Sequence, residues 1–245
     1  MLVYKFLPFF LLVVTFLNLK EITAQCLNIV DMNTWTQEGT PANGNWIVSG
    51  TGASVLQTTN SIPTFFISPY DLYNVEINGK IRVETTQDDD FIGFVIGYKN
   101  PFGTSYDDYE FYLFDWKQQG QTANGFTGLE GFTLSHINGT IPSTPAQLFQ
   151  TFWGHTPNPP TCNPIASNTG NNLGWLDNTD HFFTLIYTAT KLTIIIDSDT
   201  IFDIDGCFET GRFGFYNFSQ EQVNYSDFNY KLRLDFSIVE DSICH

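Results

Sequence analysis

Basic side chains are scarce in this sequence. Ten Lys and Arg residues stand against 26 Asp and Glu over 245 residues, which gives a formal net charge of −16 and a pI of about 4.3. A protein that binds nucleic acid needs a basic surface to contact the phosphate backbone. The shortage of positive charge therefore excludes nucleic acid as a partner. The surplus of carboxylates instead suits hard cations such as Ca²⁺, which prefer oxygen ligands.

Long apolar runs are absent after the N-terminal segment. Lys5 precedes an apolar run over residues 6–17, which is shorter than the ~20 residues that a membrane-spanning helix needs. A basic residue, a short apolar run and a small residue before the cleavage point are typical of a secretory signal peptide, which we assign to residues 1–24. A lipoprotein anchor on Cys26 is the weaker alternative, because the preceding residue is not small. We therefore predict a single exported domain, residues 25–245, without a membrane span.

Closely spaced cysteine pairs, which are typical of zinc sites, are also absent. The four cysteines are spread along the chain as Cys26, Cys162, Cys207 and Cys244. In an exported protein such cysteines indicate disulfides, although four cysteines allow three connectivities. We predict Cys26–Cys244, because the terminal strands of an antiparallel sandwich are often neighbours, and Cys162–Cys207, which would join a long loop to a strand end.

Helical patterns are rare, whereas alternation of apolar and polar residues is widespread. Residues 75–83 and 226–238 alternate in this way, which is typical of antiparallel strands with one face on a core. More apolar segments predict central strands at residues 91–98, 109–117, 132–137, 182–188, 192–197 and 212–218. We therefore predict an all-β fold, an antiparallel jelly-roll β-sandwich. Aromatic residues, 16% of the chain, favour the same fold.

Two segments depart from the strand pattern. Residues 144–149 begin with Thr and Pro, which predicts a short helical turn with a capped N-terminus. Residues 154–172 are rich in Pro and Asn and show no strand pattern. A loop of that length is usually functional or mobile.

Catalytic motifs are missing. Sandwich glycosidases of the laminarinase type place their carboxylates as Glu-x-Asp-x-x-Glu on one strand, and the sequence has no such run. The nearest candidates, Glu110 and Asp115, are five positions apart and point to opposite faces of a strand. Neither a His-Glu-x-x-His zinc site nor a Gly-x-Ser-x-Gly turn occurs. We predict that the protein is not an enzyme and keep a sandwich-fold glycoside hydrolase as the weakest alternative.

Carboxylates are clustered at one point of the chain. Asp88, Asp89 and Asp90 directly precede a predicted central strand, and Asp177 and Asp180 lie in a second acidic loop. Ca²⁺ takes roughly 6–8 oxygen ligands, which such loops supply. The triplet therefore predicts a calcium site to which the second loop contributes, while a solvated polar turn is the alternative.

Aromatic residues outside the predicted core suggest a ligand surface. Trp153, Trp175 and Tyr106 lie in or near predicted loops, and planar rings stack on sugars or anchor protein partners. Core packing is the alternative explanation, and it is strongest for Trp116, which lies inside a strand. Asn138, Asn217 and Asn224 begin glycosylation sequons that matter if the source is a eukaryote.

Several ordered motifs resemble one family. Residues 86–98 resemble the Asp-Asp-Asp-aromatic-x-Gly-Phe-x-x-Gly-Tyr strand of the thrombospondin C-terminal domain. Residues 111–118 resemble its Phe-Tyr-x-x-x-Trp-Lys-Gln strand, and residues 173–177 its x-Gly-Trp-x-Asp loop. Residues 211–221 resemble its Gly-Arg-x-Gly…Phe-Ser-Gln-Glu segment.

The resemblance implies a jelly roll of the L-type lectin or concanavalin kind that binds Ca²⁺ and acts in extracellular adhesion. The family's acidic run corresponds to Asp88, Asp89 and Asp90, and its loop aspartate to Asp177. The implied partner is an extracellular protein, with a glycan as the lectin alternative. The Val-Val-Met elements linked to receptor binding are replaced at residues 113–115 and 194–196, so binding to the animal integrin-associated receptor is not carried over.

Overall fold

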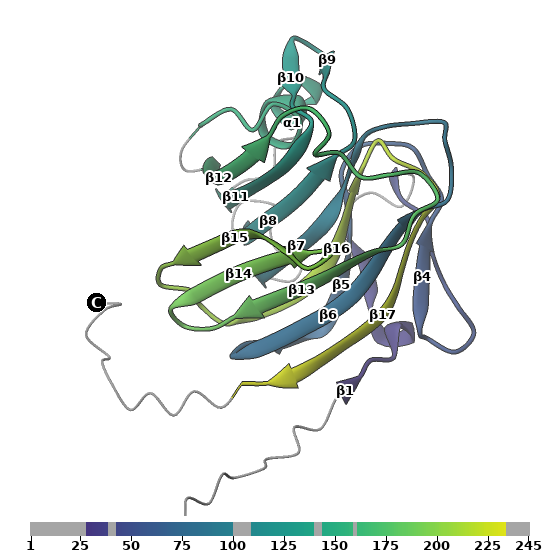
Figure 1. The fold of residues 1–245 in the computed structure, drawn as a ribbon, viewed down its shortest axis with the longest axis vertical. Coiled ribbons are helices and arrows are strands. Elements are labelled where there is room, and N and C mark those ends of the chain that lie inside the picture. Colours follow the sequence, from purple (N-terminus) through teal and green to yellow (C-terminus); the bar gives the residue numbers. More distant parts are fainter. Residues whose placement is uncertain (1–27, 39–42, 100–108, 140–143, 159–160, 234–245) are drawn as a thin grey trace, which may run out of the picture.

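Two antiparallel sheets packed face to face form the protein (Figure 1). The computed structural model describes residues 28–38, 43–99, 109–139, 144–158 and 161–233. The predicted all-β sandwich is confirmed. The predicted signal peptide, Tyr106, Cys26 and Cys244 lie outside the described residues.

The first sheet, called sheet A, contains eight strands among the described residues. In spatial order they are β15 (Asp199–Asp205), β14 (Lys191–Ile196), β13 (His181–Tyr187), β6 (Val75–Val83), β17 (Val223–Leu232), β4 (Ser54–Gln57) and β3 (Trp46–Val48), with β1 (Asn28–Ile29) paired to β17. Buried and half-buried residues alternate along β6, as the sequence predicted, because one face of sheet A lies on the core and the other faces solvent.

The second sheet, sheet B, contains seven strands within the described ranges. Their order is β12 (Cys162–Thr169), β11 (Gly131–Gly139), β8 (Tyr109–Lys117), β7 (Phe91–Lys99), β16 (Gly211–Phe218), β5 (Thr64–Leu72) and β2 (Thr36–Glu38). The remaining elements are the hairpin of β9 (Gln121–Ala123) and β10 (Phe126–Gly128), the short 3₁₀ helix η1 (Met32–Thr34) and the helix α1 (Pro145–Phe152).

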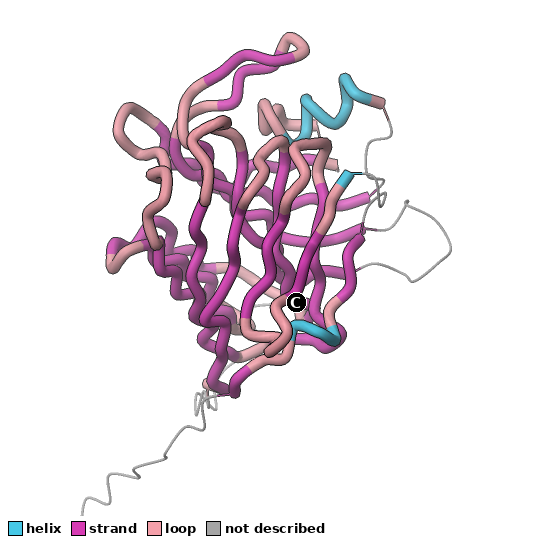
Figure 2. Tube along the Cα trace, turned by 90° about the vertical axis from the view of Figure 1, so that its right-hand side faces the viewer, coloured by secondary structure: helices cyan, strands magenta, loops and turns pink. Residues whose placement is uncertain are grey.

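Sheet B is covered on both faces, which explains why its central strands are continuously apolar. One hydrophobic core fills the space between the sheets. A second core lies on the outer face of sheet B, where Leu148 and Phe152 of α1 and the following Trp153 pack on Phe91 and Tyr216. Figure 2 shows the helical segment outside the strands. Every residue of β16 is buried as a result.

The predicted helical turn is confirmed, and it is longer than predicted because α1 runs from Pro145 to Phe152. The hydroxyl of Thr144 accepts a hydrogen bond from the backbone N–H of Gln147, and Pro145 occupies the first turn. Among the described residues, no helix is long and apolar enough to cross a membrane.

The predicted long loop over residues 154–172 is wrong in part, because β12 lies within it. This strand pairs with β11 at the edge of sheet B, and the register shifts between Leu134 and Ser135, next to Pro164. A proline has no N–H to donate and is therefore confined to edge strands and irregular pairing. Pro164 obscures the strand pattern in the sequence, but it is compatible with β12 because it lies at irregular pairing on an edge strand.

The predicted Cys162–Cys207 disulfide is wrong. Cys162 is a free cysteine, and its buried thiol points into the second core, 3.8 Å from the carbonyl oxygen of Thr151. Cys207 instead lines a small cavity with Lys99, Glu110 and Glu209. Cys162 lies in β12 and not at the tip of a loop, so its side chain is committed to the core. The predicted Cys26–Cys244 pair falls on residues outside the described ranges.

We expect the Cys162 thiol to be chemically inert in the folded protein. Burial, together with the negative charge of Asp115, raises its pKa to about 12, and the thiolate is the reactive form. Iodoacetamide at pH 8 should leave Cys162 unmodified until urea unfolds the chain, as measured by peptide mapping. Equal alkylation rates with and without urea would contradict this expectation.

Candidate metal centre

The acidic triplet lies in the loop between β6 and β7, directly before Phe91, as predicted. The carboxylates of Asp88, Asp89 and Asp90 offer oxygen atoms that all lie within 4.8 Å of one another. Within the described part of the chain, this is the group of at least three His, Cys, Asp or Glu residues that could hold a metal ion. The sequence therefore located the cluster correctly.

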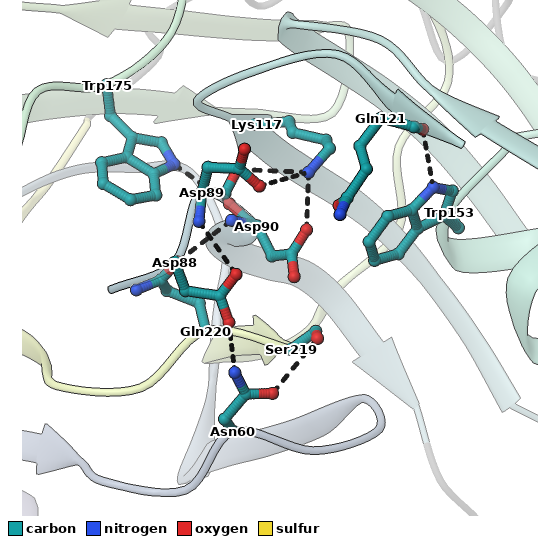
Figure 3. Close-up of polar contacts among 10 residues, drawn as sticks. All are labelled: Asn60, Asp88, Asp89, Asp90, Lys117, Gln121, Trp153, Trp175, Ser219 and Gln220. Atoms are coloured by element: carbon teal, nitrogen blue, oxygen red, sulfur yellow. Dashed lines mark hydrogen bonds and ion pairs between the residues drawn. The ribbon is translucent and has the colours of Figure 1, made fainter. Parts of the chain in front are cut away.

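A lysine that the sequence analysis did not single out lies inside this cluster (Figure 3). Lys117, the last residue of β8, is fully buried, and its ammonium nitrogen lies 2.6 Å from Oδ1 of Asp90 and 3.4 Å from Oδ1 of Asp89. It also donates to the carbonyl oxygen of Asp89 at 3.2 Å. Its position follows from the register of β7 and β8, which places Lys117 opposite Phe91 and which spacing along the chain does not specify.

Asp90 is held from several directions. Its backbone N–H donates to Oε1 of Gln220 at 3.0 Å, and its carbonyl oxygen accepts from Nε1 of Trp175 at 3.1 Å. Burial raises the pKa of its carboxyl to about 6, although the nearby charge of Lys117 opposes that rise. Asp90 is therefore the rigid inner member of the triplet.

Asp88 forms the more open side of the cluster. One of its carboxylate oxygens accepts from the amide of Asn60, whose own oxygen accepts from the hydroxyl of Ser219 at 3.2 Å. The other oxygen accepts from the backbone N–H of Asp89 at 3.0 Å. Three loops that are far apart in the sequence thus meet at the triplet (Figure 3). Ser219 lies in the segment that resembles the family's Phe-Ser-Gln-Glu motif, but spacing along the chain does not show that it and Asn60 meet at the triplet.

Asp177 lies near the triplet but is not a member of it. Oδ1 of Asp177 accepts from the side-chain amide of Gln118 at 3.1 Å, and the backbone N–H of Gln118 donates to the carbonyl oxygen of Asp89 at 3.2 Å. One glutamine therefore separates the two. Asp180, the other aspartate of that loop, forms ion pairs with Lys80 and Arg82.

The aromatic residues predicted to bind a ligand are buried. Trp153 is 2% exposed and Trp175 is 0% exposed. Their indole N–H groups donate to the carbonyl oxygens of Gln121 and Asp90, respectively. The prediction that these rings stack on a ligand is wrong for both, because Trp153 packs in the second core on the outer face of sheet B and Trp175 packs in the main core.

Glu110 and Asp115 lie on opposite faces of β8, as predicted. Glu110 pairs with Lys99 and His136 at the half-buried end of the strand. Asp115 is buried against the second core, where Nε2 of His155 lies 2.6 Å from its Oδ2. Burial raises the pKa of Asp115, and the charge of His155 opposes the rise. The two carboxylates cannot flank one glycosidic bond.

The three sequons differ in accessibility. Asn217 is fully buried: its oxygen accepts from the hydroxyl of Tyr225 at 2.6 Å, and its amide donates to the carbonyl of Gln220. Attachment of a glycan there is incompatible with the fold, so that predicted site is wrong. Asn138 and Asn224 are half-buried, and their glycosylation stays a prediction.

The charges and donor atoms of the triplet fit a hard divalent cation. Three carboxylates converge at one buried ammonium, which contacts those of Asp89 and Asp90, and the cluster has an excess of two negative charges if all three are ionised. All the offered side-chain atoms are oxygens, the donor type that Ca²⁺ prefers. Asp88 and Asp89 are half-buried, so a cation can approach from their side.

A family model described as the thrombospondin C-terminal region matches residues 41–233. The chain belongs to this family. Thrombospondin-2 of Gallus gallus is 32% identical over 204 residues, which are 77% of this chain and 16% of that protein. Cartilage oligomeric matrix protein of Mus musculus is 29% identical over 219 residues, 82% of this chain and 27% of that protein. This chain thus spans only a minor part of the length of these relatives.

Solved structures share the fold at low identity. The carbohydrate-binding module CBM66 from Bacillus subtilis matches with a TM-score of 0.51 at 10% identity, over 81% of this chain and 95% of that one. The VIP36 exoplasmic/lumenal domain in its Ca²⁺- and mannose-bound form matches with a TM-score of 0.51 at 14% identity, over 86% of each chain. These similarities confirm the lectin-like β-sandwich.

Proposed function

We propose that this protein is a secreted, calcium-binding adhesion module of the extracellular-matrix type. The observation that carries the proposal is the acidic triplet, in which three carboxylates converge, two of them contact a single buried ammonium, and two negative charges stay uncompensated. Membership of the thrombospondin C-terminal family supports it. Secretion rests on the signal peptide proposed for residues 1–24, ahead of a single domain over residues 25–245.

Asp88, Asp89 and Asp90 would hold the ion, and Asp177, which lies one glutamine away from the triplet, is proposed as a contributor from a neighbouring loop. Bound Ca²⁺ would supply positive charge that relieves the repulsion between the carboxylates. The protein's own contribution is to fix the donors. Gln220 and Trp175 hold the backbone of Asp90, and Asn60 holds the carboxylate of Asp88. An ion that binds the folded state in preference to the unfolded one stabilises the fold.

The proposed partner is an extracellular protein, and a glycan is the second candidate. The lectin hypothesis is supported by the similarity of the fold to that of the mannose-bound VIP36 domain and that of the carbohydrate-binding module. The burial of Trp153 and Trp175 speaks against stacking of a sugar on either ring. We therefore rank protein recognition first. A hydrolytic function is not proposed, because Glu110 and Asp115 lie on opposite faces of one strand.

Binding assays with and without Ca²⁺ distinguish these functions. We expect the exported protein to adhere to an extracellular-matrix preparation in Ca²⁺, to detach in chelator, and to resist competition by free oligosaccharides. Displacement by an oligosaccharide would favour the lectin function instead. Adhesion of equal strength in chelator would contradict the calcium-dependent module. An Asp203→Asn variant, which alters an exposed carboxylate of sheet A outside the triplet, serves as the control and should adhere as the wild type does.

A further inference from the structure

Lys117 has an environment built for a cation. Its side chain has no exposed surface, and a charge removed from water needs compensating partners. Its ammonium meets two carboxylates, one carbonyl oxygen and two aromatic rings: the ring centroids of Phe91 and Trp153 lie 5.1 and 4.6 Å away. Aromatic faces attract cations at such distances.

Elements on several sides make room for this ammonium. Trp153, the C-cap residue of α1, is fixed by its hydrogen bond to the carbonyl oxygen of Gln121 (Figure 3). Gly128 of β10 lies against the lysine stem: a Cβ there would lie 3.1 Å from Cδ of Lys117 and 3.0 Å from Cζ of Phe91. A side chain at position 128 would therefore crowd the lysine stem and the ring of Phe91. The lysine is held by β7, β10 and the end of α1 together.

We propose that Lys117 is a resident cation that sets the affinity of the acidic triplet for metal ions. This inference rests on the proposed calcium site. The ammonium contacts the inner carboxylate, Asp90, and one oxygen of Asp89, whose side chain is 29% exposed. A metal ion therefore shares the cluster with a positive charge that cannot leave. Lys117 acts through the carboxylates and is a positioning residue.

The charge count gives the direction of the effect. With all three carboxylates ionised, the cluster carries two excess negative charges with Lys117 and three without it. Lys117→Met keeps the apolar stem against Phe91 and Trp153 but removes the ammonium. Because like charges a few ångströms apart interact strongly at a partly buried site, we expect Ca²⁺ to bind the variant at least about tenfold more tightly. The calcium-free variant should melt at a lower temperature than the wild type, and Ca²⁺ should restore that loss.

Two further variants separate charge from structure. Lys117→Met combined with Asp90→Asn returns the cluster to two excess charges, so its Ca²⁺ affinity should fall back toward that of the wild type. Lys191→Met changes the net charge equally but removes a lysine of sheet A that is one-third exposed and pairs with Asp203 and Asp205. Its affinity should stay at the wild-type value.

The test is a Ca²⁺ titration of all four proteins by chelator competition, with melting temperatures measured alongside. Preparing Lys117→Met in Ca²⁺ and then removing the ion with graded chelator covers the case in which the variant folds only with the ion. Tighter binding by Lys117→Met alone supports the inference. Unchanged or weaker binding by Lys117→Met, or failure to fold even in Ca²⁺, overturns it. If the wild type does not bind Ca²⁺ but Lys117→Met does, the proposed calcium site of the wild-type protein is overturned, whereas the role of Lys117 is not.

Discussion

Trp175→Ala is expected to lower the free energy of unfolding by about 3–5 kcal/mol, the range for truncating a buried aromatic side chain to alanine. Trp175 is fully buried in the main core. Its N–H also satisfies the carbonyl oxygen of Asp90, so the substitution removes the support of the inner carboxylate together with the packing. Urea denaturation followed by circular dichroism measures the change.

Two neighbouring variants calibrate this result. Trp175→Phe keeps much of the apolar volume and loses the N–H, so it should cost less than alanine, roughly 1–3 kcal/mol. Leu176→Ala changes the next residue, which is 61% exposed, and should alter stability by no more than about 0.5 kcal/mol. A Trp175→Ala variant as stable as Leu176→Ala would show that the indole does not hold the loop to the core.

Asp115→Ala is expected to destabilise the fold by about 3 kcal/mol or more, the cost of removing one partner from a buried pair. The carboxylate lies inside the second core, and His155 depends on it as a hydrogen-bond partner at 2.6 Å. Its loss leaves the imidazole facing apolar side chains beside Phe91. Chemical denaturation is again the measurement.

Glu110→Ala is the matched control, because it removes a carboxylate from the same strand but on the opposite face. Glu110 pairs with Lys99 at 3.2 Å, with both side chains about one-third exposed. Pairs in contact with solvent contribute roughly 0–1 kcal/mol. If Glu110→Ala were as destabilising as Asp115→Ala, the second core would not depend on its buried acid.

Local patterns predicted much of this fold. The alternation along β6 and the capped start of α1 are short-range signals, and both elements form where their residues indicated. The acidic triplet was also found from the sequence, because its carboxylates are consecutive and directly precede an apolar strand. Such features depend on neighbouring residues and survive without knowledge of the tertiary structure.

Long-range packing decided the rest. Lys117 reaches the triplet because β7 and β8 pair in a register that places it opposite Phe91, and spacing along the chain does not specify that register. The sequence predicts a loop at Trp153, but α1 places this residue on the outer face of sheet B. The sequence likewise predicts a loop at Cys162, but this residue lies in the edge strand β12, and its thiol points inward.

Calorimetric titration of Ca²⁺ into chelator-stripped protein tests the proposed metal centre most directly. The matched variant is Asp88→Asn combined with Asp89→Asn, which removes two carboxylates and leaves the buried contact between Asp90 and Lys117 in place. We predict a saturable binding heat and a higher melting temperature for the wild type, with both effects lost in the variant. Equal heats and equal melting temperatures in the two proteins would contradict the assignment of Asp88, Asp89 and Asp90 as a calcium site.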